Sequence, residues 1–324
     1  MNKDFVNWGI LGCAGIADRA VIPGIMGAKN AKLYAISSRS EKKLQDFKQK
    51  YNPIKEYRSY DELLHDSNVD AVYIPLPNSM HYKWVLKAAE MKKHILCEKP
   101  LGLTAKEVAE IKEVCDKNGV LFMEGLAYRH SPLTQKVKSL IDEGTIGKLK
   151  FMESFVCFYF DDLNDVRFNK DLAGGATYDI GCYNIDIIRH IAGSEPLSIY
   201  ATGEIEAQSG VDEGSCIMME FKDGFKAMSY CSFKCAERIG YTIIGELGIL
   251  EVAAWFNAEG KVKITLKKNE NIEEIIIDCP DNYMLEVEQF GRCILTGEKP
   301  LVTFEESLGN SKVIEEALKQ IFNK

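Results

Sequence analysis

The sequence lacks an apolar run long enough to cross a membrane, a block rich in lysine and arginine, and any Cys-x-x-Cys pair. We therefore expect no transmembrane helix, and with a net charge of −8 no sequence-independent nucleic-acid binding. None of the five histidines has metal-like spacing, so no metal site is expected. The ten scattered cysteines suit reduced thiols, and the polar start Met1–Phe5 shows no export signal. These features predict a cytoplasmic protein without membrane or nucleic-acid partners.

What the chain does have is an ordinary globular composition and room for two domains. Its 324 residues are 46% apolar and 27% charged. The first part alternates strands with helices, which predicts right-handed βαβ units and a parallel sheet. The expected strands are 6–11, 32–37, 71–75, 94–97 and 121–124, and the expected helices are 16–26, 41–51, 80–91 and 104–118.

After about residue 125 the pattern changes to consecutive strands. Asp223-Gly224 between two of them indicates a hairpin turn. The expected strands are 151–160, 215–221, 225–233, 239–245, 249–254, 262–266 and 273–277, and the expected helices are 133–143, 178–191, 284–296 and 304–322. This pattern predicts a largely antiparallel sheet with helices mainly on one face. We therefore expect two domains, 1–124 and 125–324.

A glycine-rich turn joins the first strand to the first helix. Compared with G-x-G-x-x-G/A, Gly12 forms the turn, Ala14 takes the close-approach position and Ala17 packs the helix on the strand. Ala14 departs from the stricter pattern, and Gly15 compensates in our interpretation. Amides at this helix start, including that of Ile16, suit a pyrophosphate. The alternative is an ordinary turn.

The second strand ends in Ser37-Ser38-Arg39, with no carboxylate before Glu41. An NAD-specific site carries an acidic residue here, whereas hydroxyls and an arginine suit a 2′-phosphate. We therefore expect NADP(H), with NAD possible. The alternative is a helix cap beside a solvated arginine.

The strand at 94–97 ends in Glu98-Lys99-Pro100. Ligands of open α/β sheets bind at the carboxyl ends of the strands, so Lys99 stands where reactive groups gather. A following proline fixes the backbone and can adopt a cis peptide bond. The alternative is a Glu-Lys pair on the surface.

In these motifs the chain resembles the glucose–fructose oxidoreductase / inositol dehydrogenase / MocA (GFO/IDH/MocA) family over nearly its whole length. The resemblance rests on GILGCAGIA, the Ser-Ser-Arg strand end, residues 74–81 (IPLPNSMH), residues 97–100 (CEKP) and residues 174–183 (GGATYDIGCY). It implies an α/β fold in which an N-terminal Rossmann parallel sheet (1–124) binds the dinucleotide. A C-terminal α+β domain (125–324) with a largely antiparallel open sheet would bind substrate and form oligomers.

The resemblance also implies that Lys99 is catalytic and that Asp179 and Tyr183 complete the site. Many family members carry histidine at the position of Tyr183. Tyrosine is similar to the branch of dihydrodiol dehydrogenases, glucose–fructose oxidoreductase and NADP-linked xylose dehydrogenases. The turn with Pro75 and Asn78 would lie beside the nicotinamide, with His81 and Glu98 contributing to the cofactor site.

The chemistry of Lys99, Asp179 and Tyr183 supports their assignment to one catalytic site. Asp179 and Tyr183 are four residues apart, which places both on one helix face. A phenol is a poor base near neutral pH unless an ammonium such as that of Lys99 stabilises the phenolate. The alternative is that Asp179 caps the helix after Gly174-Gly175 and that Tyr183 belongs to the core.

Other residues have two interpretations each. Arg129, His130, Arg167 and Phe168 either line or cover a substrate or are ordinary loop residues. The aromatic residues of the strand at 151–160 belong to a sheet core or to a dimer interface. The resemblance favours an interface, so we expect a homo-oligomer, either dimer or tetramer.

Together these features predict an NADP(H)-dependent oxidoreductase that acts on a secondary hydroxyl or carbonyl of a sugar or small cyclic polyol. One alternative is a non-catalytic dinucleotide-binding regulator. The other is a hydrolase that uses nicotinamide in a transient oxidation.

Overall fold

The computed structural model describes residues 4–323 and divides them into two compact units. The first unit runs to His130 and also contains Asp281–Ser307. The second contains Ser131–Pro280 and the chain from Leu308 onward. A single boundary after residue 124 was expected, whereas the chain here leaves the first unit and returns to it. Of the polar start, Met1–Lys3 lie outside the described residues.

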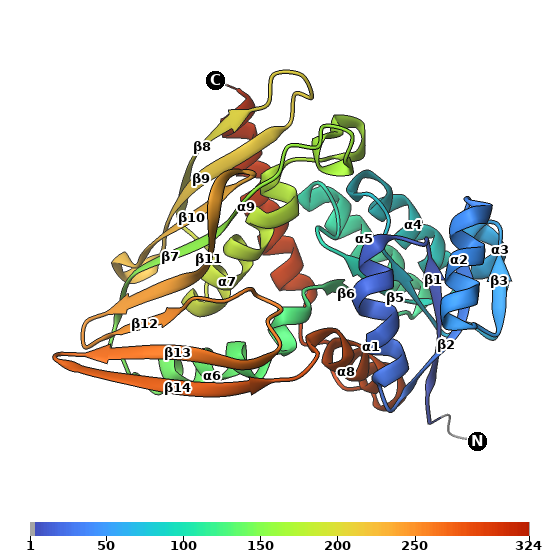
Figure 1. Ribbon diagram of the computed structural model, residues 1–324, viewed down its shortest axis with the longest axis horizontal. Coiled ribbons are helices and arrows are strands. Elements are labelled where there is room, and N and C mark those ends of the chain that lie inside the picture. Colours follow the sequence, from blue (N-terminus) through green and yellow to red (C-terminus); the bar gives the residue numbers. More distant parts are fainter. Residues whose placement is uncertain (1–3, 324) are drawn as a thin grey trace. The chain divides into compact units, whose positions relative to one another are not determined.

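The first unit is built on a six-stranded sheet of order β3-β2-β1-β4-β5-β6 (Figure 1). Its strands are β1 (Val6–Leu11), β2 (Ala31–Ser37), β3 (Lys55–Tyr57), β4 (Ala71–Ile74), β5 (His94–Glu98) and β6 (Phe122–Gly125). All neighbouring pairs are parallel, which confirms the expected βαβ pattern. The strand order reverses between β1 and β4, the point at which such sheets bind ligands.

Helices follow the strands of this unit. They are a π-helix η1 (Ala17–Val21) continued by α1 (Ile22–Gly27), then α2 (Glu41–Tyr51), α3 (Tyr60–His65), α4 (Asn78–Glu90), α5 (Ala105–Asn118), a 3-10 turn η2 (Ala127–His130) and α8 (Asn282–Thr296). Thr104 accepts the Glu107 amide and caps α5, as its sequence indicates. The short elements β3 and α3 were not expected, because three and six residues carry too little periodicity.

Helix α8 explains why the chain returns to the first unit. Its Phe290 ring lies 6.0 Å from that of Trp8 in β1, and both side chains are fully buried. A Cβ atom on Gly24 of α1 would stand only 2.9 Å from the backbone of Met284, so a glycine is needed for this close packing.

The second unit contains an eight-stranded sheet of order β14-β13-β12-β11-β7-β10-β9-β8 (Figure 1). The strands are β7 (Leu149–Tyr159), β8 (Ser198–Ile205), β9 (Asp212–Glu220), β10 (Lys226–Ser232), β11 (Lys234–Gly245), β12 (Ile249–Val252), β13 (Gly260–Lys268) and β14 (Asn271–Cys279). Within this sheet, β7 and β10 are the only described neighbours that pair in parallel, so the expected largely antiparallel character is confirmed. Asp223 adopts φ 66° in the predicted turn between β9 and β10.

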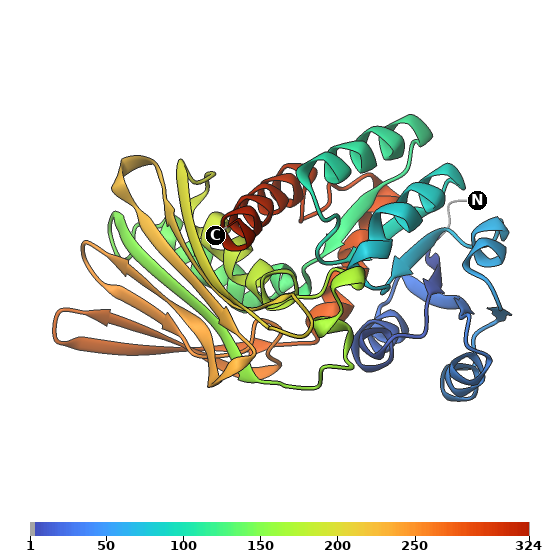
Figure 2. The ribbon, with the colours of Figure 1, turned by 90° about the horizontal axis from the view of Figure 1, so that it is seen from above.

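Three longer helices of this unit lie on one face of its sheet (Figure 2). They are α6 (Pro132–Asp142), α7 (Cys182–Ala192) and α9 (Phe304–Phe322), which belongs to this unit from Leu308 onward. Short turns η3 (Val166–Phe168), η4 (Lys170–Leu172), η5 (Thr177–Gly181) and η6 (Lys222–Gly224) complete the unit. Strand β8 was not expected, because its residues are mostly polar or partly exposed. The aromatic side chains around β7 divide: Phe155 is buried, whereas Tyr159 is 66% exposed. No helix in residues 4–323 has the length and apolar character to span a bilayer.

Candidate active site

The glycine-rich turn lies at the carboxyl end of β1 in the first unit. Gly12 has φ 120°, and a Cβ atom there would lie 2.9 Å from Leu76. Its amide donates to the Ser37 carbonyl at 3.0 Å, which ties the turn to β2. Ala14 is half-buried and Gly15 is exposed, so the turn presents backbone to solvent just before helix η1. The first amides of a helix have no acceptor within it, which gives this loop the capacity to bind an anion.

The three residues at the end of β2 are not equivalent. Ser37 is fully buried, and its hydroxyl donates to the Ile10 carbonyl at 2.9 Å. Ser38 is also buried, and its hydroxyl accepts the Ser40 amide at 3.1 Å. Arg39 is exposed, and its guanidinium lies 5.7 Å from the ring centre of Tyr60. Of the three side chains, that of Arg39 is therefore the one accessible to a phosphate here.

His81 holds two loops at the same edge of the sheet. Its imidazole is fully buried, with Nδ1 2.8 Å from the Pro100 carbonyl and Nε2 2.7 Å from the Leu76 carbonyl. Burial is the main cause that lowers the pKa of His81, and the charge of Lys99 lowers it further. The residue therefore positions the loops after β4 and β5 instead of presenting a polar atom on the surface.

Glu98 and Lys99 are half-buried at the carboxyl end of β5, and the Lys99–Pro100 peptide bond is cis. The Tyr73 hydroxyl donates to a carboxylate oxygen of Glu98 at 2.5 Å. Burial and the charge of Glu98 raise the pKa of Tyr73, so the phenol stays protonated and remains a donor. The turn after β4 lies along this edge too, with Pro75 buried and Asn78 beginning α4.

In the second unit, the helix that carries Asp179 and Tyr183 begins as the π-helix η5 and continues as α7. Asp179 lies inside η5, two residues after its first residue Thr177, so it is not the N-cap that the alternative interpretation requires. Its carboxylate accepts a hydrogen bond from Arg167 Nε at 2.7 Å. The charge of Asp179 is the main cause that raises the pKa of Arg167. Arg167 was considered from sequence only as a substrate-covering residue, and this ion pair was missed.

Tyr183 stands at the start of α7 and is half-buried. Its ring centre lies 5.5 Å from that of Phe256, whose ring in turn lies 6.2 Å from that of Tyr241. The tyrosine is therefore held by aromatic packing while part of its side chain stays accessible.

Three other candidates are buried within their units. Arg129 is 4% exposed and forms an ion pair with Glu306. His130 is equally buried, and burial lowers its pKa to about 4, so it is neutral near pH 7. Phe168 is buried and stacks on Phe160, with ring centres 6.1 Å apart.

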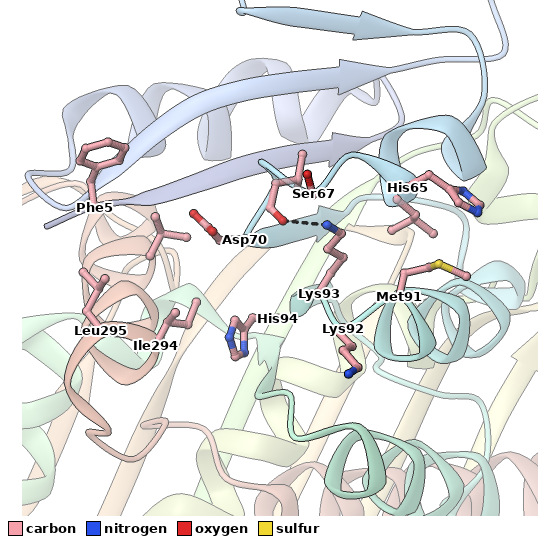
Figure 3. Close-up of a pocket in the computed structure, with 13 residues that line it drawn as sticks. Phe5, His65, Ser67, Asp70, Met91, Lys92, Lys93, His94, Ile294 and Leu295 are labelled. Carbon is pink, nitrogen blue, oxygen red and sulfur yellow. Dashed lines mark hydrogen bonds between the residues drawn. The ribbon is translucent and has the colours of Figure 1, made fainter. Parts of the chain in front are cut away.

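A cavity of about 710 Å³ opens at the opposite edge of the first unit's sheet (Figure 3). It is lined by Val6 and His94, which begin β1 and β5, and by Asp70, which precedes β4. Lys93 donates to the Val69 carbonyl there at 2.9 Å, and burial lowers the pKa of this lysine. Because ligands of parallel sheets bind at the carboxyl ends of the strands, we assign this cavity no part in the reaction.

The described residues contain neither a cluster suited to a metal ion nor a disulfide bond. Within residues 4–323, no group of three or more His, Cys, Asp or Glu side chains is arranged to hold a metal ion. The ten cysteines, all within this range, form no disulfide.

Comparison with known proteins adds independent information. Residues 6–126 match the family model of oxidoreductases with a NAD-binding Rossmann fold, and residues 134–251 match the GFO/IDH/MocA C-terminal domain. The chain is 35% identical to D-xylose 1-dehydrogenase (NADP(+)) 2 of Haloferax volcanii, over 95% of each protein. It is 27% identical to trans-1,2-dihydrobenzene-1,2-diol dehydrogenase of Xenopus laevis, over 97% of each.

Similarity in structure agrees with the similarity in sequence. The 3-ketoreductase KijD10 of Actinomadura kijaniata, solved in complex with NADP and TDP-benzene, has a TM-score of 0.93 and 25% identity, covering 98% of each chain. The two-unit fold, the family models over both units and a relative of 35% identity lead to one conclusion. The chain belongs to the GFO/IDH/MocA family of oxidoreductases.

Proposed function

We propose that this protein transfers hydride between NADP(H) and a secondary hydroxyl or carbonyl of a sugar or small cyclic polyol. One observation carries the proposal: the Gly12 turn, the exposed Arg39 and Lys99 all stand at the carboxyl edge of one parallel sheet. NADP in the name of the xylose dehydrogenase and in the KijD10 complex supports this choice of cofactor.

The residues present fit such a cofactor. Gly12 allows the turn to adopt φ 120° before the helix that would face the pyrophosphate, and the exposed Arg39 offers a cation for a 2′-phosphate. We propose that the cofactor is held by Gly12, Ala14, Gly15, Ile16, Ala17, Ser37, Ser38, Arg39, Pro75, Asn78, Glu98 and Lys99, with His81 fixing two of the loops. Ser37 and Ser38 would act through backbone and shape, because both side chains are buried. When bound, NADP(H) supplies or accepts the hydride.

Three residues would handle the proton of the substrate hydroxyl. We assign Lys99 and Tyr183 to proton transfer, with the lysine charge favouring the phenolate form of the tyrosine. Asp179, held by Arg167, would orient the hydroxyl. A general acid–base pair of this kind contributes about 10²- to 10⁴-fold to the rate.

The remaining features of the proposal concern substrate and assembly. Names of relatives point to sugars and dihydrodiols. The face of the second unit's sheet that carries no helix bears Tyr200 and its cross-strand partner Met218, which are 65% and 37% exposed. An apolar exposed sheet face suits a homo-oligomer, either dimer or tetramer. We further propose a cytoplasmic enzyme without nucleic-acid or membrane partners.

Turnover tests the function directly. The purified protein with NADP⁺ should oxidise D-xylose or another member of a panel of aldoses, polyols and trans-dihydrodiols, with NADPH formed in equal amount to product. Tight NADPH binding without any turnover across the panel would favour a regulator. Product formation without net NADPH would favour the hydrolase.

Arg39→Asp should reverse the cofactor preference. Loss of a charge-assisted bond of about 1.5–3 kcal/mol should weaken NADPH binding by about 10- to 150-fold, whereas NADH binding should stay equal or improve. Fluorescence titration with both cofactors measures the change. Arg292→Asp makes the same charge change at an exposed site on α8 and should leave both affinities unchanged. Unaltered NADPH affinity in Arg39→Asp would refute the assignment of Arg39.

A further inference from the structure

A buried carboxylate from a distant strand caps the helix that carries Asp179 and Tyr183. Asp212, the first residue of β9, is 1% exposed. Its Oδ2 accepts the backbone amide of Thr177 at 2.7 Å and the Thr177 hydroxyl at 2.7 Å. Thr177 is the first residue of η5, so Asp212 satisfies an amide at the start of this helix. A carboxylate at this end also interacts favourably with the helix dipole.

The helix cannot supply such a cap itself. Its own N-cap position is Ala176, which has no side-chain acceptor. The preceding Gly175 has φ 120°, and a Cβ atom there would lie 2.1 Å from Oδ1 of Asp212. The second glycine of the Gly-Gly pair is therefore required by the carboxylate that caps the helix.

The same segment is fixed on its other side by Arg167. The Gly175 amide donates to the Arg167 carbonyl at 2.8 Å, and a Cβ atom on Gly174 would lie 2.4 Å from that carbonyl oxygen. The Arg167 side chain holds Asp179. The backbone before η5 is thus clamped between Asp212 and Arg167, and this clamp sets where the side chain of Asp179 lies.

Burial disfavours the charged form of Asp212. Burial raises its pKa to about 6, and the bonds from Thr177 only partly offset that effect. A carboxyl whose pKa is raised in the folded state adds stability at low pH, and this contribution is lost as the pH rises from about 4 to about 6. The titratable group beside Asp212 is the Cys231 thiol, and burial raises the pKa of that thiol. Ser215 links the two sites, because its Oγ lies 2.8 Å from Thr177 Oγ1 and 3.2 Å from Cys231 Sγ.

We propose that Asp212 is a positioning residue for the reaction, because it caps η5 from β9 and thereby fixes Asp179 and Tyr183 relative to Arg167. The inference rests on the proposed function, in which Asp179 and Tyr183 act on the substrate. Asp212 itself acts through Thr177 and is too buried to contact a substrate.

Asp212→Asn tests the inference, with Glu206→Gln as the matched control. Glu206 is a carboxylate of the same unit that accepts the amides of Gln208 and Ser209 in an exposed turn. We expect Asp212→Asn to lower kcat by about 10- to 100-fold, since a misplacement near 1 Å has effects of that size. NADPH affinity should not change, and the unfolding temperature should stay within about 3 °C. Hydrogen exchange of the peptide 176–183 should become faster, whereas Glu206→Gln should match wild type in kcat and in exchange of that peptide.

Further outcomes separate this inference from the proposed function. If Tyr183→Phe loses turnover while Asp212→Asn keeps full kcat, the positioning role is wrong and the proposed function stands. If Tyr183→Phe keeps full turnover, the assignment of Tyr183 fails, and exchange of the peptide 176–183 still decides whether Asp212 holds the helix. A loss of kcat in Asp212→Asn that only follows a large fall in unfolding temperature would show a structural role and overturn the inference. The unfolding free energy of wild type should also fall more between pH 4 and pH 6 than that of Asp212→Asn.

Discussion

Lys99→Met should lower kcat by about 100- to 10,000-fold, the range for loss of a general acid–base group. Methionine has a similar length and flexibility but carries no proton and no charge. The phenolate of Tyr183 would then lose the ammonium that we assign to its stabilisation. NADPH affinity should change by less than about tenfold, because the amides of the Gly12 turn and the Arg39 side chain remain. Steady-state kinetics with the best substrate, together with fluorescence titration, measure both quantities.

A second lysine provides the control for this variant. Lys87 lies on the surface of α4 and pairs with Asp61 at 2.7 Å, so Lys87→Met removes a charge from the same unit at a site without a proposed role. Its kcat should equal that of wild type. Near-normal turnover of Lys99→Met would eliminate the proposed mechanism, even if NADPH still binds.

Gly175→Ala should strongly destabilise the second unit. Alanine strongly disfavours φ 120°, and its Cβ atom would lie 2.1 Å from Oδ1 of the buried Asp212. Backbone strain and overpacking together should lower the unfolding free energy by about 2–6 kcal/mol. Any folded protein should have lost most turnover, since the start of η5 must move. Denaturant unfolding and kcat measure the two effects.

A substitution at Gly210 distinguishes the cost of the positive φ from the cost of the clash with Asp212. It also has positive φ, 69°, but the nearest atom to a Cβ there is Lys170 Cδ at 3.9 Å. Gly210→Ala should therefore cost about 1 kcal/mol and leave kcat unchanged. Equal losses of stability in the two variants would show that the contact with Asp212 is unimportant.

Much of the fold is predictable because the spacing of apolar residues within each segment indicates a helix or a strand without any knowledge of distant contacts. The alternation of strands and helices in the first unit was sufficient to predict the parallel sheet, and Asp223-Gly224 marked the turn between β9 and β10. Helices α2 and α9 begin and end at the predicted residues. The Gly12 turn was also recognisable, since a positive φ there leaves glycine as the residue that fits.

The remaining features depend on contacts between residues far apart in the sequence. Nothing near residue 281 indicates that α8 packs on β1, because its apolar face would suit any partner. Asp212 lies 35 residues from Thr177 in the sequence, and nothing distinguishes it there from any other polar residue at the start of a strand. Arg167 was one polar residue of a loop, and its bond to Asp179 could not be distinguished from solvation. Gly174-Gly175 was the one available signal, because two adjacent glycines before a helix suggest a close backbone approach.

The most direct test of the central claim is a paired titration of the purified protein with NADPH and NADH, followed by turnover of D-xylose and the wider panel. The account predicts NADPH binding at least about tenfold tighter than NADH binding, a difference of about 1.4 kcal/mol. It also predicts NADP⁺-dependent oxidation of at least one sugar, polyol or dihydrodiol. Absence of dinucleotide binding, or a clear preference for NADH, would contradict it.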